Sequence, residues 1–157
     1  MSVSPMPEGY ATITPYLSVR GASEALAFYA EAFGAQERFR LEAPDGAIMH
    51  AETEIYGQAI MLADEMAEMD FLGPQSRGGC SCSLMLYVPD VDAAFARALA
   101  AGATEVRAVE DQFYGDRMGT LKDPFGHVWF LGMRVEEVSE DEIHRRFQAM
   151  FTEPGAA

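Results

Sequence analysis

The chain has 157 residues, 49% of them hydrophobic and 23% charged, which is an ordinary composition for one globular domain. Its formal net charge of −14 at pH 7 argues against nucleic acid and anionic membranes as partners, since both are bound through clustered Lys and Arg. No apolar run is long enough to span a bilayer, and residues 1–10 lack the apolar segment of a signal peptide. Cys80 and Cys82 are too close along the chain to pair with each other, so the sequence predicts a cytoplasmic protein with reduced thiols.

The first half of the chain reads as a strand, a helix and three further strands. The strand lies within residues 14–19, and the helix after it carries an apolar stripe of Leu26, Tyr29, Ala30 and Phe33. Ser23 is the expected N-cap of this helix, and Gly34 is expected to end it. Three strand-like stretches separated by turn residues follow, at residues 37–41, 48–55 and 58–63.

After a connector at residues 65–79, the second half repeats the order of the first. Residues 83–103 match residues 14–35 at a spacing of 69 positions, which suits two duplicated half-domains rather than a solenoid. A helix is expected to start near Asp90 and end at Gly102. Strands are then expected at residues 105–109, 118–122 and 127–131.

The end of the chain predicts one more helix. Ser139-x-x-Glu142 is a capping box, and behind it lies an apolar stripe of Ile143, Phe147, Met150 and Phe151. The pattern fits two arrangements equally well: the helix packs on its own domain, or it forms a contact in a dimer.

Several motifs together resemble one known family. The most specific are residues 114–119, Tyr-Gly-Asp-Arg-Met-Gly, and residues 123–129, Asp-Pro-Phe-Gly-His-Val-Trp. With residues 13–17, 33–35, 49–52 and 60–65, they resemble the PhnB-like branch of the vicinal-oxygen-chelate superfamily, which contains glyoxalases, bleomycin resistance proteins and dioxygenases. The resemblance extends from Ile13 to Phe151.

This resemblance implies an α+β fold with two tandem βαβββ modules that form one cupped mixed sheet around a small-molecule cleft, plus a C-terminal helix. Residues 1–157 are then a single domain, with the modules at 11–64 and 80–134, the connector at 65–79, and the last helix and tail at 135–157. The resemblance also implies a homodimer in which the partner chain can complete the cleft.

The resemblance places four residues where the metal enzymes of the superfamily carry their ligands: Thr14, Met61, Ser83 and Phe130. None of these side chains is a good ligand for a divalent metal that prefers imidazole and carboxylate. The sequence therefore predicts a cleft without a metal cofactor. A displaced divalent metal at His50, Glu52 and Glu54 stays open as an alternative.

Strand alternation predicts which side chains enter the cleft. Leu17 and Val19 form the face toward the helix, as do the matching residues of the second half. The expected ligand-binding residues are therefore Thr14, Tyr16, Met61, Ser83, Met85, Tyr87 and Phe130, together with Tyr114. These aromatic, methionine and hydroxyl side chains suit a small apolar or aromatic molecule held by a few hydrogen bonds.

Three residues are candidates for chemistry. His50 and Glu52 lie two apart on one strand, so the carboxylate can orient the imidazole for proton transfer, although a solvent-exposed polar strand face gives the same pattern. Arg117 is either an electrophile that neutralises a carboxylate or enolate, with Asp116 positioning it, or part of a structural ion pair. His127 is expected to be a hydrogen-bonded structural histidine.

Two functions compete on this basis. The first is a binding protein that sequesters a small apolar or aromatic compound, and its acidity would attract a cationic one. The second is a lyase or isomerase for a small carbonyl compound, with His50 and Glu52 as base and Arg117 as electrophile. The enzyme requires these three side chains to converge at one end of the cleft.

Overall fold

The computed structural model describes residues 4–152; the outermost parts of the predicted domain, 1–3 and 153–157, lie outside the described residues. The first module contains β1 (Tyr16–Val19), α1 (Ala22–Phe33), β2 (Gln36–Glu42), β3 (Ile48–Ile55) and β4 (Gln58–Asp64). The second contains β5 (Ser83–Tyr87), α3 (Val91–Ala100), β6 (Thr104–Asp111), β7 (Asp116–Lys122) and β8 (Val128–Arg134). The predicted tandem βαβββ order and the α+β class are confirmed.

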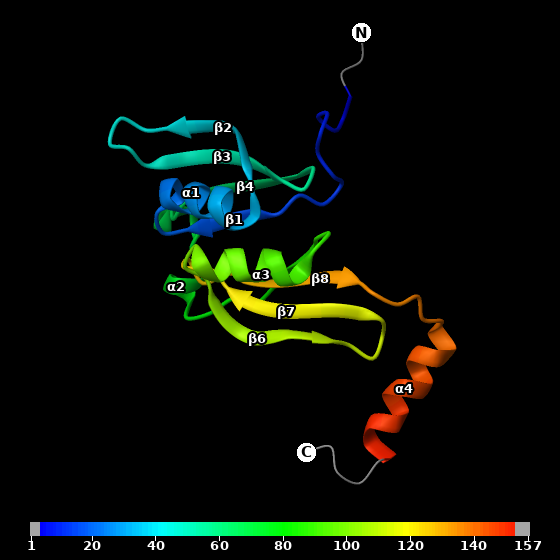
Figure 1. Cartoon of the computed structure of the whole chain (residues 1–157). Coiled ribbons are helices and arrows are strands. Elements are labelled where there is room, and N and C mark those ends of the chain that lie inside the picture. The colour runs from blue at the N-terminus through cyan, green and yellow to red at the C-terminus, as the bar shows by residue number, and fades with distance from the viewer. Residues whose placement is uncertain (1–3, 153–157) are drawn as a thin grey trace.

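Each module builds its own four-stranded mixed sheet (Figure 1). The strand orders are β1-β4-β3-β2 and β5-β8-β7-β6, and in each sheet the first strand pairs in parallel while the others pair antiparallel. The strands are thus divided between two sheets where the sequence predicted one. The modules meet instead through α1 and α3, which lie side by side between the two sheets (Figure 1).

The connector contributes two short helical elements, and the C-terminal segment contributes a longer helix. The connector holds the 3-10 turn η1 (Ala67–Met69) and the single-turn helix α2 (Pro74–Arg77), while α4 (Glu140–Thr152) follows β8 and projects from the body (Figure 1). Ser139 Oγ accepts from the Glu142 backbone N–H at 3.3 Å, which is one half of the predicted capping box, while the Glu142 carboxylate accepts from Arg145 and Arg146. Among the described helices, none combines the length and the apolar character needed to cross a membrane.

The start of α1 differs from the prediction that Ser23 caps it. The helix begins one residue earlier, at Ala22, and no side chain of the helix caps it. Asp64, at the end of β4 and far away along the chain, caps the helix instead. Its Oδ1 accepts from the backbone N–H groups of Gly21 and Ala22 at 2.9 and 2.8 Å. A carboxylate at a helix N-terminus satisfies free donors and also meets the positive end of the helix dipole. By contrast α3 is capped by a local residue, Asp90, which lies where the sequence predicted the helix to start.

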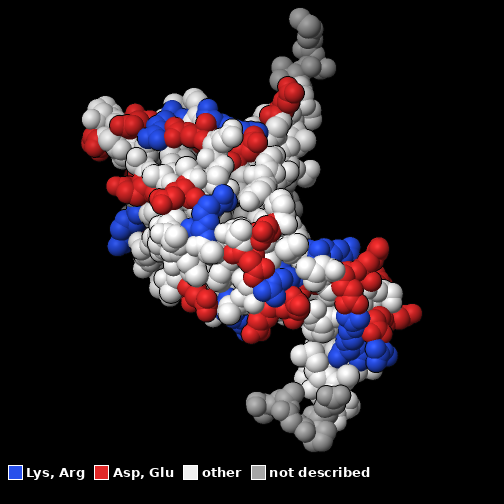
Figure 2. Space-filling view, viewed as in Figure 1, with Lys and Arg blue, Asp and Glu red and all other residues white. Residues whose placement is uncertain are grey.

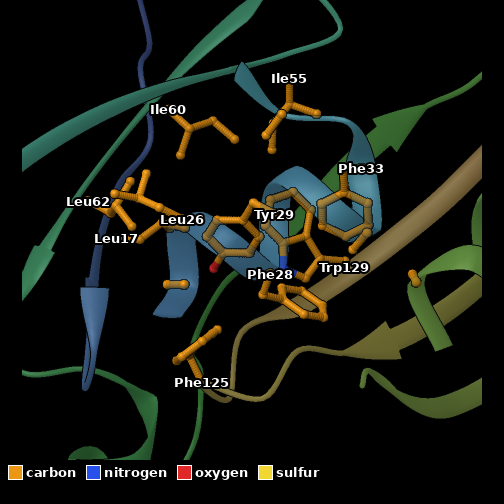
Figure 3. Packing of buried hydrophobic residues seen from close by; sticks show 14 of the residues in the cluster. Leu17, Leu26, Phe28, Tyr29, Phe33, Ile55, Ile60, Leu62, Phe125 and Trp129 are labelled. Atoms are coloured by element: carbon orange, nitrogen blue, oxygen red, sulfur yellow. The ribbon is translucent and has the colours of Figure 1, made fainter. Parts of the chain in front are cut away.

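An aromatic cluster joins the two modules (Figure 3). Trp129 of β8 packs against two side chains of α1, with ring centroids 4.8 Å from Phe33 and 5.5 Å from Tyr29. These three side chains are at most 3% exposed. Because burial of large aromatic side chains is the strongest favourable term available, this cluster holds the modules in one unit.

Candidate functional site

A row of side chains crosses the face of the first sheet opposite α1. Tyr16 pairs in register with Met61, Met61 with Glu52, and Glu52 with Phe39. Residues in register on neighbouring strands point to the same face, so these four side chains lie together. The alternate positions, Leu17, Ala51 and Leu62, are buried. The sequence predicted this facing correctly for Tyr16, Met61 and Glu52.

A hollow of about 490 Å³ opens on this face, between the sheet and the N-terminal segment. Glu52 and Met61 line it from the sheet, and residues of the N-terminal segment line it from above: Pro5, Met6, Pro7, Tyr10, Ala11, Thr12 and Thr14. Thr14 lines the hollow as predicted, but its hydroxyl donates to the Ala11 carbonyl at 3.0 Å. The floor is therefore apolar apart from one carboxylate.

Four side chains form a continuous hydrogen-bonded chain beside this hollow. The Tyr10 hydroxyl donates to Glu52 Oε2, and the other carboxylate oxygen, Oε1, lies 3.1 Å from His50 Nε2. His50 Nδ1 lies 2.9 Å from the Tyr16 hydroxyl. Since a carboxylate only accepts, Nε2 carries the imidazole proton and Nδ1 accepts from Tyr16. The predicted pairing of His50 with Glu52 is present, with the carboxylate orienting the ring.

The electrostatics of the chain favour an ionised carboxylate and neutral phenols. The hydrogen bond from Tyr10 is the main reason why the pKa of Glu52 lies below its usual value, and the hydrogen bond from His50 lowers it further. The same bond to Glu52 raises the pKa of Tyr10, and burial raises the pKa of Tyr16. Glu52 thus offers a fixed negative charge to whatever enters the hollow.

Tyr10 was missed from the sequence, where it is one aromatic residue in a segment rich in proline. Its position depends on Arg38 of β2, which donates to the Gly9 carbonyl at 3.1 Å and pairs with Glu54. These contacts fold the N-terminal segment over the sheet. No local pattern signals a contact between residues 42 positions apart, as Tyr10 and Glu52 are.

We predict that Tyr10→Phe lowers the free energy of unfolding at pH 7 by about 1 kcal/mol, the usual size of one hydrogen bond. The effect should depend on pH, because a group with a lowered pKa in the folded state stabilises above its unfolded pKa and loses this contribution as the pH falls. Urea unfolding of both proteins between pH 7 and pH 3 measures it. The difference should be constant above about pH 5 and shrink below about pH 4.5. A difference that stays constant down to pH 3 would show that Tyr10 does not act through the Glu52 carboxylate.

The predicted residues of the second module lie on the matching face of the second sheet. Met85 pairs in register with Phe130, and Ser83 and Tyr87 share their side of β5. The Tyr87 hydroxyl donates to Asp116 Oδ2 at 2.8 Å, and the Tyr114 hydroxyl lies 3.6 Å from the Met118 sulfur. Met85 lines a separate hollow of about 220 Å³ with residues of both modules, including Ile13, Pro15, Ile60 and Trp129. Met85 therefore lines a different hollow from Thr14 and Met61, and the predicted residues do not share one cleft.

Arg117 does not reach the candidate site, contrary to the enzyme hypothesis. Arg117 lies on the same face of β7 as Leu121, and Leu121 is fully buried on the side of the helices. The Arg117 side chain therefore points toward α3. Its guanidinium makes a two-point contact with Asp92 at 2.7 and 2.8 Å and bonds Asp111 at 2.9 Å. Asp116, its predicted positioning partner, accepts from Tyr87 instead. The alternative that Arg117 forms a structural ion pair agrees with this geometry.

The predicted metal-ligand positions do not fit a divalent metal. Thr14, Met61, Ser83 and Phe130 offer two hydroxyls, a thioether and a phenyl ring, which is not a donor set for such an ion. The displaced alternative does not assemble either, because Glu54 turns to Arg38 while His50 and Glu52 pair with each other. Among residues 4–152 no group of three or more His, Cys, Asp or Glu side chains is placed to hold a metal.

The comparison with family models decides the family. A model described as the glyoxalase/bleomycin resistance protein/dioxygenase superfamily matches residues 10–131. The chain belongs to this superfamily. Among curated proteins, an uncharacterised protein of Mycobacterium bovis is 48% identical over 134 residues, which cover 83% of this chain and 88% of that protein. The protein YjdN of Escherichia coli is 26% identical over 149 residues, covering 82% and 99%.

Several solved structures share the fold. TioX from Micromonospora sp. ML1 matches with a TM-score of 0.62 and 25% identity, over 82% of this chain and 100% of that one. A PhnB protein from Bacillus cereus, titled a putative 3-demethylubiquinone-9 3-methyltransferase, matches with a TM-score of 0.63 and 22% identity, over 78% and 99%. The fosfomycin resistance protein FosX from Listeria monocytogenes matches with a TM-score of 0.60 and 17% identity, over 85% and 97%. Identities this low for the last two show the fold and carry no function.

Proposed function

We propose that this protein binds a small apolar or aromatic molecule in the hollow of the first module, without a metal. The observation that carries the proposal is the ionised carboxylate of Glu52 at the floor of a hollow whose other lining residues are uncharged, among them Met61, Tyr10, Thr12 and Thr14. Mostly apolar walls with a few placed polar groups are typical of sites that orient a small molecule. The charge of Glu52 and the net charge of −14 favour a ligand with a positive charge or a hydrogen-bond donor.

The geometry favours binding over catalysis by His50. Both nitrogens of its ring are already engaged, one with Glu52 and the other with Tyr16. A general base needs a lone pair within reach of the substrate proton, and the pair on Nδ1 is used by the Tyr16 hydroxyl. The electrophile of the enzyme hypothesis is also absent from this face, because Arg117 points to α3.

One observation supports a second candidate, a lyase or isomerase for a small carbonyl compound. The aligned chain Tyr16–His50–Glu52 could pass a proton, with Tyr16 as the group that meets the substrate. Turnover of small carbonyl compounds that is lost in both His50→Gln and Tyr16→Phe would establish this function in place of simple binding. Metal content, from elemental analysis and from thermal unfolding with added nickel, zinc and manganese, separates a metal-dependent enzyme from both candidates.

We infer further that a second copy of the chain covers the open sheet faces. Aromatic and aliphatic side chains on them stay 41–58% exposed, namely Tyr16, Phe39, Leu41, Met85 and Tyr87. Exposed apolar side chains grouped on one surface are typical of an interaction site. Figure 2 shows acidic and basic side chains interspersed on the visible face and along α4, with uncharged surface in white between them. Sedimentation at several concentrations tests this, and a monomer at all of them would contradict it.

The binding proposal is tested with a matched set of aromatic probes that are cationic, neutral or anionic. We predict that the cationic probe binds most tightly and that Glu52→Gln weakens its binding about tenfold, or about 1.4 kcal/mol. Isothermal calorimetry measures both effects. The neutral probe should lose little, since its contacts with Met61 and Tyr10 remain.

Two variants control for nonspecific effects of charge and fold. Glu31→Gln removes the same charge from an exposed position of α1, and Arg117→Met removes the cation paired with α3. Both should bind the probes as the wild type does. An equal loss of probe affinity in Glu31→Gln and Glu52→Gln would show that the effect comes from net charge. A loss of affinity in Arg117→Met alone would show that Arg117 belongs to the binding site.

A further inference from the structure

A second cavity, outside the hollow of the first module, contains a thiol and a histidine that the proposed function does not use. It has a volume of about 260 Å³ and lies where the connector meets β1 and the start of β5. Cys80, Cys82 and His127 line it together with Tyr16, Phe71 and Leu72. Cys80 is partly exposed to this cavity, whereas His127 is 7% exposed. A nucleophile and a buried nitrogen base therefore share one cavity.

The protein fixes which nitrogen of His127 can act as a base. Nε2 lies 3.1 Å from the Ser18 carbonyl oxygen. A carbonyl only accepts hydrogen bonds, so Nε2 carries the proton of the neutral ring, and Nδ1 keeps a free lone pair. Nδ1 faces the Cys80 sulfur at 3.9 Å. The buried contact with Ser18 thus presents a basic nitrogen to the thiol.

Cys80 and Cys82 differ in their surroundings although they are two residues apart. The Cys80 thiol has two acceptors within reach, His127 Nδ1 and the Cys82 carbonyl oxygen at 2.9 Å. Cys82 is the more exposed of the two residues, but partial burial of its thiol and the neighbouring Cys80 raise its pKa. The thiolate is the reactive form of cysteine, so Cys82 is the poorer nucleophile. The charged groups Asp70 and Arg77 also line the cavity, but they pair with each other at 2.8 Å.

We propose that Cys80 is a site of covalent addition for small α,β-unsaturated carbonyl compounds, with His127 as its base. The proton of the Cys80 thiol passes to His127 Nδ1, and the sulfur forms a bond to the β-carbon of the compound. The electron pair of the C=C bond moves to the carbonyl oxygen as an enolate, and the proton on Nδ1 returns to the α-carbon. The result is addition of S–H across the double bond, which balances without an oxidant, reductant or metal. Tyr16 and Phe71, whose rings lie 5.1 Å apart, supply apolar walls for the body of the compound.

The test uses N-ethylmaleimide, a small compound of this class, on two variants of the full chain. Cys82→Ser leaves only Cys80, and Cys80→Ser leaves only Cys82, so mass spectrometry of the intact protein reports one thiol at a time. We expect Cys80 to react at least about tenfold faster than Cys82 at pH 7 in the native protein, because His127 is placed to take the thiol proton as the bond to carbon forms. In guanidinium the two rates should become equal, since the fold creates the difference.

The role of His127 is tested separately from its structural role. His127→Gln should slow Cys80 to the rate of Cys82 while circular dichroism shows a native fold. If this variant does not fold, the proposal is tested by the rate at which N-ethylmaleimide adds to Cys80 in the native protein, divided by the rate in the denatured protein. A ratio of about ten or more supports the proposal. A ratio at or below one, a faster Cys82, or a folded His127→Gln protein that reacts as fast as wild type would overturn it. None of these outcomes depends on the hollow of the first module.

Discussion

Replacing Asp123 with alanine is expected to lower the free energy of unfolding by about 3–5 kcal/mol, because it breaks a buried charged network. Asp123 is 4% exposed and accepts four hydrogen bonds. Its Oδ2 accepts from the Tyr29 hydroxyl at 2.8 Å and from Trp129 Nε1 at 2.9 Å. Its Oδ1 accepts from the backbone N–H groups of Phe125 and His127 at 3.0 and 2.9 Å. Alanine would leave all four donors buried without a partner.

Urea unfolding followed by circular dichroism measures this loss. Tyr29→Phe removes one of the donors and leaves the carboxylate with three, so its cost should be about 1 kcal/mol. Glu31→Ala, which removes an exposed carboxylate of α1, should change stability by less than about 0.5 kcal/mol. If Asp123→Ala behaves like Glu31→Ala, water must be replacing the carboxylate, and the four contacts contribute little to stability.

The same residue shows how far the sequence could predict the fold. The order Asp-Pro-Phe-Gly predicts a turn at residues 123–126, and the Gly126 N–H indeed bonds the Asp123 carbonyl at 3.1 Å. The side chain of Asp123 acts over a longer range, because Tyr29 lies 94 positions away. Local patterns thus predicted the elements and three of the four residues of the α1 stripe, Leu26, Tyr29 and Phe33, whereas Ala30 is exposed. The polar contacts that join the modules depend on tertiary packing. Asp64, which caps α1 in place of Ser23, is a second case.

The candidate site divides in the same way. Alternation in β3 was sufficient to place His50 and Glu52 on one face, and the structure shows their pairing at 3.1 Å. The same rule places Arg117 on the helix side of β7 with Leu121, so its distance from the candidate site was predictable from the sequence. Tyr10 could not be predicted, because its segment has no regular structure and is held by Arg38. Functional residues on irregular segments escape periodicity, since periodicity describes helices and strands only.

Trp129→Ala is expected to cost about 3–5 kcal/mol as well, since it opens a cavity between the modules. The side chain is 1% exposed and contacts both Phe33 and Tyr29 of the other module. Such a loss is a large part of the free energy of unfolding of a typical domain, which is about 5–15 kcal/mol. As the chain has one tryptophan, the variant loses its fluorescence signal, so circular dichroism must follow unfolding. Trp129→Phe should cost less, because it keeps most of the apolar contact. It still loses the hydrogen bond to Asp123.

The two large effects should not add, and their coupling tests whether the modules form one cooperative unit. Trp129 donates directly to Asp123, so a protein that lacks one partner has already lost their shared contact. The double variant should therefore be less unstable than the sum of the single losses, by about 0.5–3 kcal/mol. Strict additivity would show that the bond at 2.9 Å contributes no coupling. Two separate unfolding transitions in the double variant would show that the aromatic cluster and Asp123 are what make the two βαβββ modules unfold together.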